Sequence, residues 1–197
     1  MNKKIFSIEM LKFFALILVA NSHMGLLYGK YASFATGGSI GDSLFFFCSG
    51  FTLFKGRFDR FDNWYKRRIG RIYPSVFAWA LVSSVFFNGH SDMKTICLHG
   101  GGWFVTCIMI FYVILYIMRK YLMKNKITPF AVYSLILVVW YLFEDHATLR
   151  MYSSGIHFAW SVYFMFMLLG AYVGGQEISL PNWKTKWYFV LLLPYRT

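Results

Sequence analysis

Charged residues are scarce in this sequence: only 14% of its 197 residues are Asp, Glu, Lys or Arg, against about 25% in a typical soluble domain. Hydrophobic residues reach 58% of the chain, and the mean hydropathy is +0.50. Phe, Tyr and Trp together contribute 22%, which is typical of lipid-facing surfaces and of the aromatic belts at membrane interfaces. The composition therefore indicates a membrane protein.

Cysteine is also rare, and its distribution excludes two kinds of site. Cys48, Cys97 and Cys107 show neither a CxxC pair nor another metal-binding spacing, so no disulfide framework and no metal site are predicted. Cys48 and Cys107 fall inside expected helices, where we interpret them as small apolar fillers. The sequence shows no internal repeat, no low-complexity tract and no soluble domain.

Hydrophobic segments account for most of the chain. A membrane-spanning helix needs about 20 residues, fewer where its ends are polar. The second segment is short, and its helix is expected to begin near Gly37; Pro74 is expected in the first turn of the third helix, where proline is tolerated. The predicted fold class is all-α, a polytopic integral membrane helical bundle in a single domain over residues 1–197, with six spans at 5–28, 40–54, 69–88, 102–118, 127–143 and 156–175 and a truncated seventh at 187–194.

The basic residues between these segments alternate in number from one gap to the next. Fifteen Lys and Arg lie before the first segment or in residues 55–71, 119–126 and 176–186, whereas the remaining gaps hold only Lys30, Lys94 and Arg150. This alternation is the positive-inside pattern of a chain with a cytoplasmic N-terminus. We therefore interpret the net charge of +12 as a topology signal in a multi-pass protein of the cell membrane, and expect no nucleic acid as a partner.

The first hydrophobic segment, Ile5–Tyr28, carries Lys12 and His23. It has no convincing signal-peptidase site, so we expect it to remain as a signal anchor. The two residues are eleven positions apart, which in a helix is three turns plus roughly 20° and about 16 Å along the axis. Both side chains are therefore expected on one face, as a functional line across the bilayer. Alternatively, Lys12 reaches the headgroups and His23 hydrogen-bonds a neighbouring helix.

Four further positions are candidates for substrate binding. Asp42, near the outer end of the second segment, is either a partner for His23 or a helix cap. Arg68 and Arg71 are spaced i, i+3 at an expected helix start, so they are neighbours on one face. Two guanidinium groups beside free backbone N–H groups bind phosphate well, although both arginines would also serve topology alone. Trp103 is either an interfacial residue or part of a substrate-facing mouth.

Two other patterns are interpreted as structural. Ser49 and Gly50 are small enough to let helices approach closely. The sequence Glu144-Asp145-His146 combines carboxylates with an imidazole, but it lies between two hydrophobic segments and is expected to be a solvated loop.

Four motifs, taken in order, resemble those of acyltransferase family 3, a family of integral membrane proteins. In many of its members an Arg stands at the position of Lys12. Because members of this family usually have more membrane helices, the resemblance implies that the chain is the truncated N-terminal portion of such a domain. The motifs are the basic-x10-His pattern from Lys12 to His23, Phe45-Phe46-x-x-Ser49-Gly50-Phe51, Arg68-x-x-Arg71 followed by Tyr73-Pro74, and Trp103-Phe104.

The resemblance implies a function that agrees with the physical interpretation. Members of the family use acyl-CoA, usually acetyl-CoA, as donor substrate from the cytoplasm, with no bound cofactor, and acylate a hydroxyl of an extracytoplasmic glycan or lipid-linked sugar. Arg68 and Arg71 would then dock the phosphates of CoA. His23 would act as general base or carry the acyl group transiently, and Lys12 would orient the donor or stabilise negative charge.

Three alternatives remain open at this point. A small-molecule transporter also places charged residues on inward faces, but transporters usually show related halves and broken helices, which this sequence does not show. A non-catalytic membrane partner would use the same packing features without needing Lys12 or His23. The chain would also be an inactive fragment if the expected truncation removes helices that the site requires.

Overall fold

The computed structural model of the chain describes residues 6–86, 102–123, 125, 127–143 and 157–176. All regular structure in this part of the chain is helical, with seven α-helices, one 3-10 helix and no strand, which confirms the all-α prediction. The elements are α1 (Phe6–Ser22), α2 (Gly25–Tyr28), the 3-10 helix η1 (Gly29–Phe34), α3 (Gly38–Lys55), α4 (Phe61–Phe86), α6 (Gly102–Tyr121), α7 (Thr128–Phe143) and α8 (His157–Gly174).

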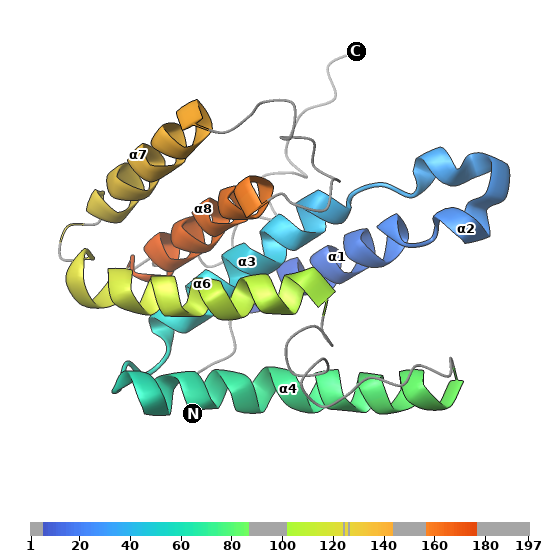
Figure 1. Cartoon of the computed structure of the whole chain (residues 1–197), viewed down its shortest axis with the longest axis horizontal. Coiled ribbons are helices and arrows are strands. Elements are labelled where there is room, and N and C mark those ends of the chain that lie inside the picture. Colours follow the sequence, from blue (N-terminus) through green and yellow to red (C-terminus); the bar gives the residue numbers. More distant parts are fainter. Residues whose placement is uncertain (1–5, 87–101, 124, 126, 144–156, 177–197) are drawn as a thin grey trace, which may run out of the picture.

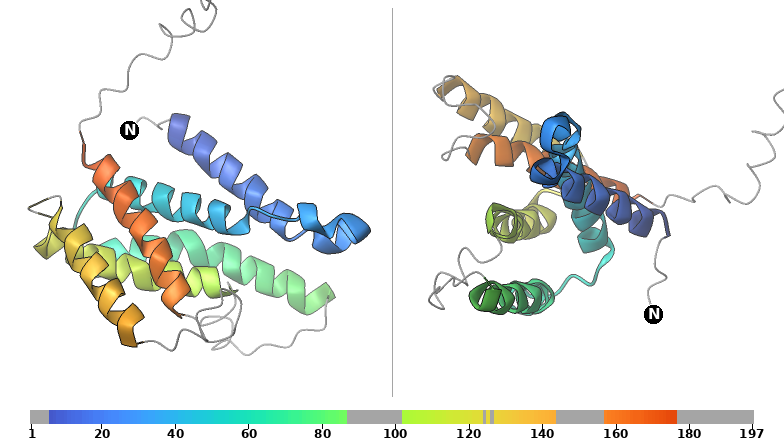
Figure 2. Two further views of the ribbon diagram at one scale, coloured as in Figure 1. Left: turned by 90° about the horizontal axis from the view of Figure 1, so that it is seen from above. Right: turned by 90° about the vertical axis from the view of Figure 1, so that its right-hand side faces the viewer.

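Helix α3 lies at the centre of the bundle. It packs most extensively against α8 and next against α1, while α7 lies against α8 and α4 lies against α6 (Figures 1 and 2). Close approach between α3 and α8 depends on two glycines, because a Cβ atom at Gly50 would collide with the carbonyl oxygen of Met167 and one at Gly170 with that of Phe47. The packing role expected for Gly50 agrees with this contact.

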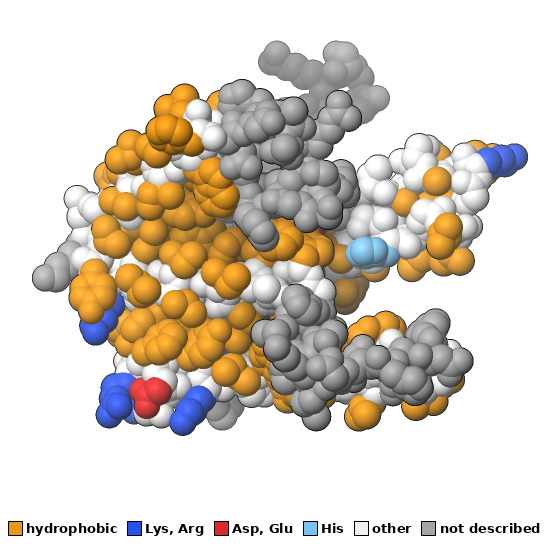
Figure 3. Space-filling view, viewed as in Figure 1, with side chains coloured by type: hydrophobic (Ala, Val, Ile, Leu, Met, Phe, Trp, Pro, Cys, Tyr) orange, Lys and Arg blue, Asp and Glu red, His pale blue; other side chains and the backbone are white. Residues whose placement is uncertain are grey.

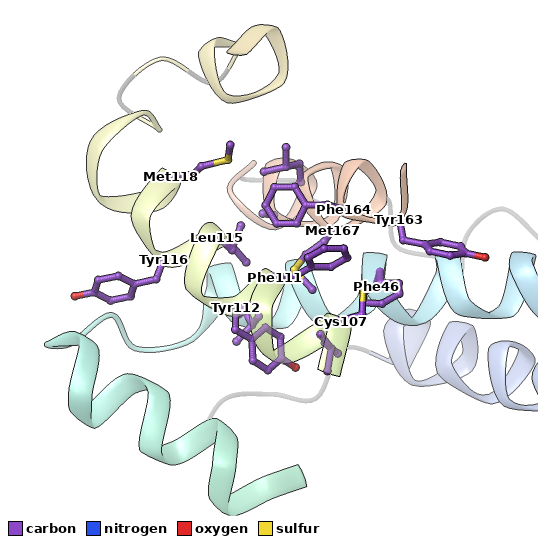
Figure 4. Packing of buried hydrophobic residues seen from close by; sticks show 14 of the residues in the cluster. Phe46, Cys107, Phe111, Tyr112, Leu115, Tyr116, Met118, Tyr163, Phe164 and Met167 are labelled. Carbon is purple, nitrogen blue, oxygen red and sulfur yellow. The ribbon is translucent and has the colours of Figure 1, made fainter. Parts of the chain in front are cut away.

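Aromatic and sulfur-containing side chains from α3, α6 and α8 form the core (Figure 4). Phe111 of α6 has its ring centroid 5.3 Å from that of Phe46 in α3 and 5.1 Å from that of Phe164 in α8. Phe46, Phe164 and Met167 are completely buried. In a lipid environment such packing, rather than removal of apolar surface from water, is what holds helices together.

The six predicted spans correspond to helices in the described part of the chain, but the length and composition of most of these helices do not confirm them as spans. Among the described residues only α6 is by itself long and apolar enough to cross a membrane; α1 with its bent continuation Gly25–Phe34 would be a second if the two form one span. Helix α7 and the segment Trp160–Gly174 are apolar but shorter. Six spans plus a seventh are thus not confirmed, and residues 187–194 lie outside the described part of the chain.

The predicted single helix over 5–28 is wrong, because α1 ends at Ser22 and the chain bends by 59° before continuing. Side-chain hydrogen bonds stop the helix. The Asn21 amide donates to the carbonyl oxygens of Phe34 and Thr36, and the Ser22 hydroxyl bonds back to Val19. One helix therefore covers the segment from Lys12 to Ser22, but His23 itself lies in the turn after that helix.

The predicted start of the third helix is also wrong, because α4 begins at Phe61, eight residues before position 69. The early turns are held by burial of Trp64 and Arg68 on one face. Pro74 is consequently inside the helix and not in its first turn. For the same reason Arg68 and Arg71 are not accompanied by the free N–H groups of a helix start. The expected beginning of the second helix near Gly37 is confirmed, since Gly37 precedes α3 with a left-handed φ of 96°.

Hydrophobic side chains cover most of the face shown in Figure 3, whereas Lys, Arg and an acidic side chain gather where α4 begins. Exposed apolar residues occur along α1, α4 and α7. Contiguous apolar surface of this kind is typical of helices that face lipid.

Candidate functional site

A cleft of about 1010 Å³ opens where α1 ends and where α3, α6 and α8 begin. One wall is polar and comes from the end of α1 and the start of α3, and the other is aromatic and comes mainly from α6 and α8. The lining residues are Val19, Ser22, His23, Ala35, Thr36, Gly37, Gly38, Ser39, Ile40, Asp42, Phe45, Trp103, Phe104, Trp160 and Tyr163.

The polar wall contains both an imidazole and a carboxylate. His23 is exposed at the end of α1, and Asp42 lies half-buried in the second turn of α3. The two side chains are close enough to interact electrostatically. Both residues line the same cleft, and the partnership of Asp42 with His23 stays a prediction. A carboxylate close to an imidazole can stabilise the imidazolium that forms in general base catalysis.

The aromatic wall is a stack of nearly parallel rings. Trp103, at the start of α6, has its ring centroid 5.7 Å from that of Trp160 at an interplanar angle of 20°, and 5.8 Å from that of Tyr163 at 29°. The side chain of Trp103 is 39% exposed, whereas Tyr163 is buried. Sequence analysis singled out Trp103 but missed Trp160 and Tyr163. Their i, i+3 spacing on one helix was visible in the sequence, but the helix that they would face was not.

A loop at the rim of the cleft is fixed by Asn21, another residue that sequence analysis did not single out. The side-chain amide donates to the carbonyl oxygens of Phe34 at 2.8 Å and Thr36 at 3.0 Å, and its oxygen accepts from the Tyr28 hydroxyl at 2.6 Å. These three bonds tie the α2–η1 segment to the end of α1. Because Thr36 lines the cleft two residues from the end of η1, Asn21 sets the position of this rim.

Lys12, the other half of the predicted catalytic line, does not line the cleft. Its Nζ lies 2.9 Å from Oε1 of Glu9, one turn earlier in α1, and both side chains are partly exposed. The structure therefore brings His23, Asp42 and Trp103 together in one cleft and leaves Lys12 about 16 Å from His23 along the chain direction of α1, at about 1.5 Å per residue.

The predicted phosphate-binding pair lies in α4 and does not line the cleft, and its two members are in different environments. Arg68 is only 7% exposed, and its guanidinium lies over the ring of Trp64 at 5.1 Å. The Nε atom of Arg68 has no hydrogen-bond partner among the described residues. Arg71 is exposed, yet close enough to Arg68 for their charges to repel. The two are thus neighbours, as predicted.

Other basic residues are held by the protein itself. Arg119 of α6 donates to the carbonyl oxygen of Leu53 at 2.8 Å, and its guanidinium lies 4.6 Å from the ring centroids of both Phe54 and Phe58. It therefore caps the last turn of α3, where unpaired carbonyl oxygens favour a cation.

Asp59 joins the turn between α3 and α4 to the second turn of α4. Its carboxylate accepts from Arg67 and from Arg57, each at 2.8 Å, and its carbonyl oxygen accepts from the Tyr116 hydroxyl at 3.0 Å. The hydrogen bond from Arg67, with help from Arg57, holds the pKa of Asp59 below its usual value. We refer below to Arg67, Arg68, Arg71 and Arg119 together with Asp59 as the arginine end.

The cleft lies at the start of α3, whereas Arg119 and Asp59 of the arginine end lie at or just beyond its last turn. From Asp42 to Gly56 there are fourteen residues, or about 21 Å at about 1.5 Å per residue. A substrate that reached both ends would have to be long, with its charged part at one end and its reacting part at the other. Among the described residues there is no group of three or more His, Cys, Asp or Glu side chains that would hold a metal ion.

The fold and these two regions define the described part of the chain as an all-helical protein with an open cleft. A family model described as an acyltransferase domain matches residues 5–195, and the chain belongs to this family, acyltransferase family 3. No curated protein and no solved structure matches the chain.

Proposed function

We propose that this protein is a multi-pass membrane O-acyltransferase that transfers an acyl group, most simply acetyl, from cytoplasmic acyl-CoA to a hydroxyl of an extracytoplasmic glycan or lipid-linked sugar. Membership of an acyltransferase family supports the type of reaction. The observation that carries the proposal is the presence of both His23 and Asp42 in the lining of one cleft large enough for a substrate.

In the proposed reaction the acceptor hydroxyl lies at His23. His23 takes the hydroxyl proton as the oxygen attacks the thioester carbonyl; a new C–O bond forms, the C–S bond breaks, and the proton passes to the departing thiolate to give CoA. Asp42 stabilises the imidazolium in the interval. A second route, in which the acyl group moves first to His23 and then to the acceptor, uses the same residues.

The donor is proposed to bind from the arginine end. CoA carries several phosphates at one end of a long arm and the thioester at the other, which suits a donor that runs along α3 from its end toward the cleft, since Asp42 and Gly56 are about 21 Å apart at about 1.5 Å per residue. The exposed Arg71 is available for charge-assisted hydrogen bonds to phosphate, and the buried Arg68 adds a second positive charge. We further propose that Lys12 stabilises negative charge along the path of the donor.

The proposed orientation places the arginine end in the cytoplasm and the cleft outside. The asymmetric distribution of Lys and Arg along the sequence supports it. Cys48 and Cys107 are buried, so a Cys48→Ser, Cys107→Ser variant leaves Cys97 as the thiol to be probed. An impermeant thiol reagent should label it in intact cells. Labelling only after the cells are opened would reverse the orientation.

The decisive experiment measures release of CoA and transfer of radiolabelled acetyl in membranes that contain the full chain and glycan. The wild-type chain should consume acetyl-CoA. The His23→Ala variant should lose activity by a factor of about 10²–10⁴, as is typical when a general base is removed, while still inserting into the membrane. Met24→Ala is the matched control, since Met24 is adjacent but does not line the cleft.

Two results would contradict the proposal. A wild-type chain that binds but never consumes acetyl-CoA would be a transporter component or a non-catalytic membrane partner. Full transfer by His23→Ala would reduce His23 to a packing residue.

A further inference from the structure

Aromatic and polar side chains line different walls of the cleft, and the acyl-transfer reaction does not require this separation. Its aromatic wall presents the nearly parallel rings of Trp103, Trp160 and Tyr163. The opposite wall presents the hydroxyl groups of Ser22, Thr36 and Ser39 next to His23 and Asp42. A ligand that fills such a cleft has an apolar face and a hydrogen-bonding edge.

The charges of the lining residues further restrict which ligands the cleft can bind. None of the described residues that line the cleft is Lys or Arg, while Asp42 contributes a carboxylate. A phosphate or a sugar carboxylate would therefore be placed near the like charge of Asp42, with no Lys or Arg among the described lining residues to offset it. Inside a partly enclosed site this repulsion is stronger than in water. The cleft is consequently suited to an uncharged group.

A pyranose ring has the matching shape and polarity. Its two faces carry C–H groups, which are attracted to the electron-rich face of an aromatic ring, and its edges carry hydroxyl groups. A lipid chain would leave the polar wall unsatisfied, and a nucleotide would bring its phosphates next to Asp42. The volume of about 1010 Å³ lies at the top of the range of about 300–1,000 Å³ for small-molecule sites, so a sugar does not fill it alone.

We propose that the cleft binds a neutral pyranose unit of the acceptor, stacked on the Trp103–Trp160 wall with its hydroxyl edge toward His23 and Asp42, and that it discriminates against acidic and phosphorylated sugars. The identification of this sugar as the acceptor rests on the proposed acyltransferase function. The binding site itself is a separate claim, because a sugar binds there whether or not transfer follows.

Ligand-observed NMR tests the binding claim without any turnover. The probes are methyl glucoside, methyl N-acetylglucosaminide and methyl glucuronide, added to the full-length wild-type chain in lipid nanodiscs at pH 7. The neutral glycosides should show saturation transfer from protein protons to their ring C–H protons, and this signal should level off as the glycoside concentration rises. Methyl glucuronide should bind about tenfold more weakly or not at all, because a tenfold loss corresponds to about 1.4 kcal/mol of like-charge repulsion.

Variants of the two walls distinguish the contribution of aromatic stacking to sugar binding from the effect of the Asp42 charge. Trp160→Ala should weaken binding of the neutral glycosides by about tenfold, and Trp160→Phe by less, because a smaller ring still stacks. Trp79→Ala is the matched control, since Trp79 is exposed on α4 and does not line the cleft. Asp42→Asn should bring binding of the glucuronide close to that of the glucoside. This variant keeps the test valid even where Trp160→Ala fails to fold.

The outcomes distinguish this inference from the proposed function. If none of the neutral glycosides binds, or if the glucuronide binds as tightly as the glucoside, the inference is wrong even where membranes still transfer acetyl groups. If the glycosides bind as described and acetyl-CoA is never consumed, the sugar site stands and the acyltransferase proposal fails. Equal binding to wild-type, Trp160→Ala and Trp79→Ala proteins would place the sugar elsewhere.

Discussion

At the arginine end most charged groups are already held by the protein, whereas at the cleft His23 and Asp42 face an open volume of about 1010 Å³. Arg119 is bonded to the end of α3 and lies against two phenyl rings, and Arg67 is paired with Asp59. Around the cleft the side-chain hydrogen bonds that fix the backbone come mainly from Asn21, which does not take part in the proposed reaction.

This difference shows that neighbouring charges in a motif need not share a role. Arg68 and Arg71 are one turn apart, yet Arg68 is buried beside Trp64 and Arg71 is exposed. A buried guanidinium with an unsatisfied Nε is costly to retain. A role of Arg68 in binding a ligand or in holding the packing around Trp64 explains this cost. Setting the membrane orientation does not, because any surface Lys would serve for that.

The largest effect is expected where the two regions are joined, at the contact of α3 with α8. In Gly50→Ala the new Cβ would meet the carbonyl oxygen of Met167, a backbone atom that moves only if the helices separate. Ordinary overpacking costs about 1–3 kcal/mol, and a backbone collision should exceed that range. The melting temperature in detergent should fall, and the apparent KM values for donor and acceptor should both rise.

Gly70→Ala provides the control for that prediction. Gly70 also lies within a helix, but no atom lies within 4 Å of a Cβ built there. Replacing it should therefore leave stability unchanged or raise it by up to about 1 kcal/mol through helix propensity. If Gly50→Ala and Gly70→Ala behave alike, α3 and α8 are not in the close contact described here.

The second prediction separates the two arginines. Arg71→Ala should raise the apparent KM for acetyl-CoA by about ten- to a hundredfold, as expected from loss of a charged hydrogen bond worth about 1.5–3 kcal/mol, with little change in thermal stability. Arg68→Ala should affect the donor KM and also lower the melting temperature, because its side chain packs on Trp64. Lys should rescue either position poorly, since it lacks the planar fork. A defect confined to the acceptor KM would assign these arginines to folding or topology.

The third prediction concerns the rim of the cleft. Asn21→Ala removes two donated hydrogen bonds, each worth about 0.5–1.5 kcal/mol, and should release the loop that carries Thr36. The acceptor KM should rise several-fold while the donor KM stays constant, because the loop is far from the arginine end. Ser43→Ala is a suitable control, since the Ser43 hydroxyl only bonds back to its own helix at Ser39. Equal changes in both KM values would show that Asn21 acts on overall stability.

Much of the fold could be predicted from local sequence, and the failures have a common physical cause. Hydrophobic length located the helices, and Gly37 located the start of α3 because its left-handed backbone is a local requirement. The bend after Ser22 could not be predicted, since it depends on bonds from Asn21 to residues 13 and 15 positions away. The early start of α4 was missed because its first turns are polar.

The candidate site divides in the same way. His23 and Asp42 stand out in the sequence because ionisable groups are unusual in hydrophobic segments. Trp160 does not stand out among the many aromatic residues of this chain, and only its stacking on Trp103 across two helices identifies it. Tertiary contacts between distant segments are therefore the part of the site that a single sequence leaves undetermined.

The smallest effect is expected at Asp59, which tests whether the arginine end is held by its own ion pairs. Because hydrogen bonding to Arg67 lowers the pKa of Asp59 in the folded protein, the carboxylate stabilises the fold fully above its unfolded pKa of about 3.9, and this contribution is lost as pH falls through the lower folded pKa. The melting temperature of Asp59→Asn should thus lie below that of wild type at pH 6, and the two should converge toward pH 2. Asp62→Asn is the control, because its exposed pair with Arg60 at 3.4 Å should contribute less than about 0.5 kcal/mol. A constant difference between Asp59→Asn and wild type over the whole pH range would mean that the Asp59 side chain acts by shape and not by charge, and the arginine end would then be free to give up its pairs to a ligand.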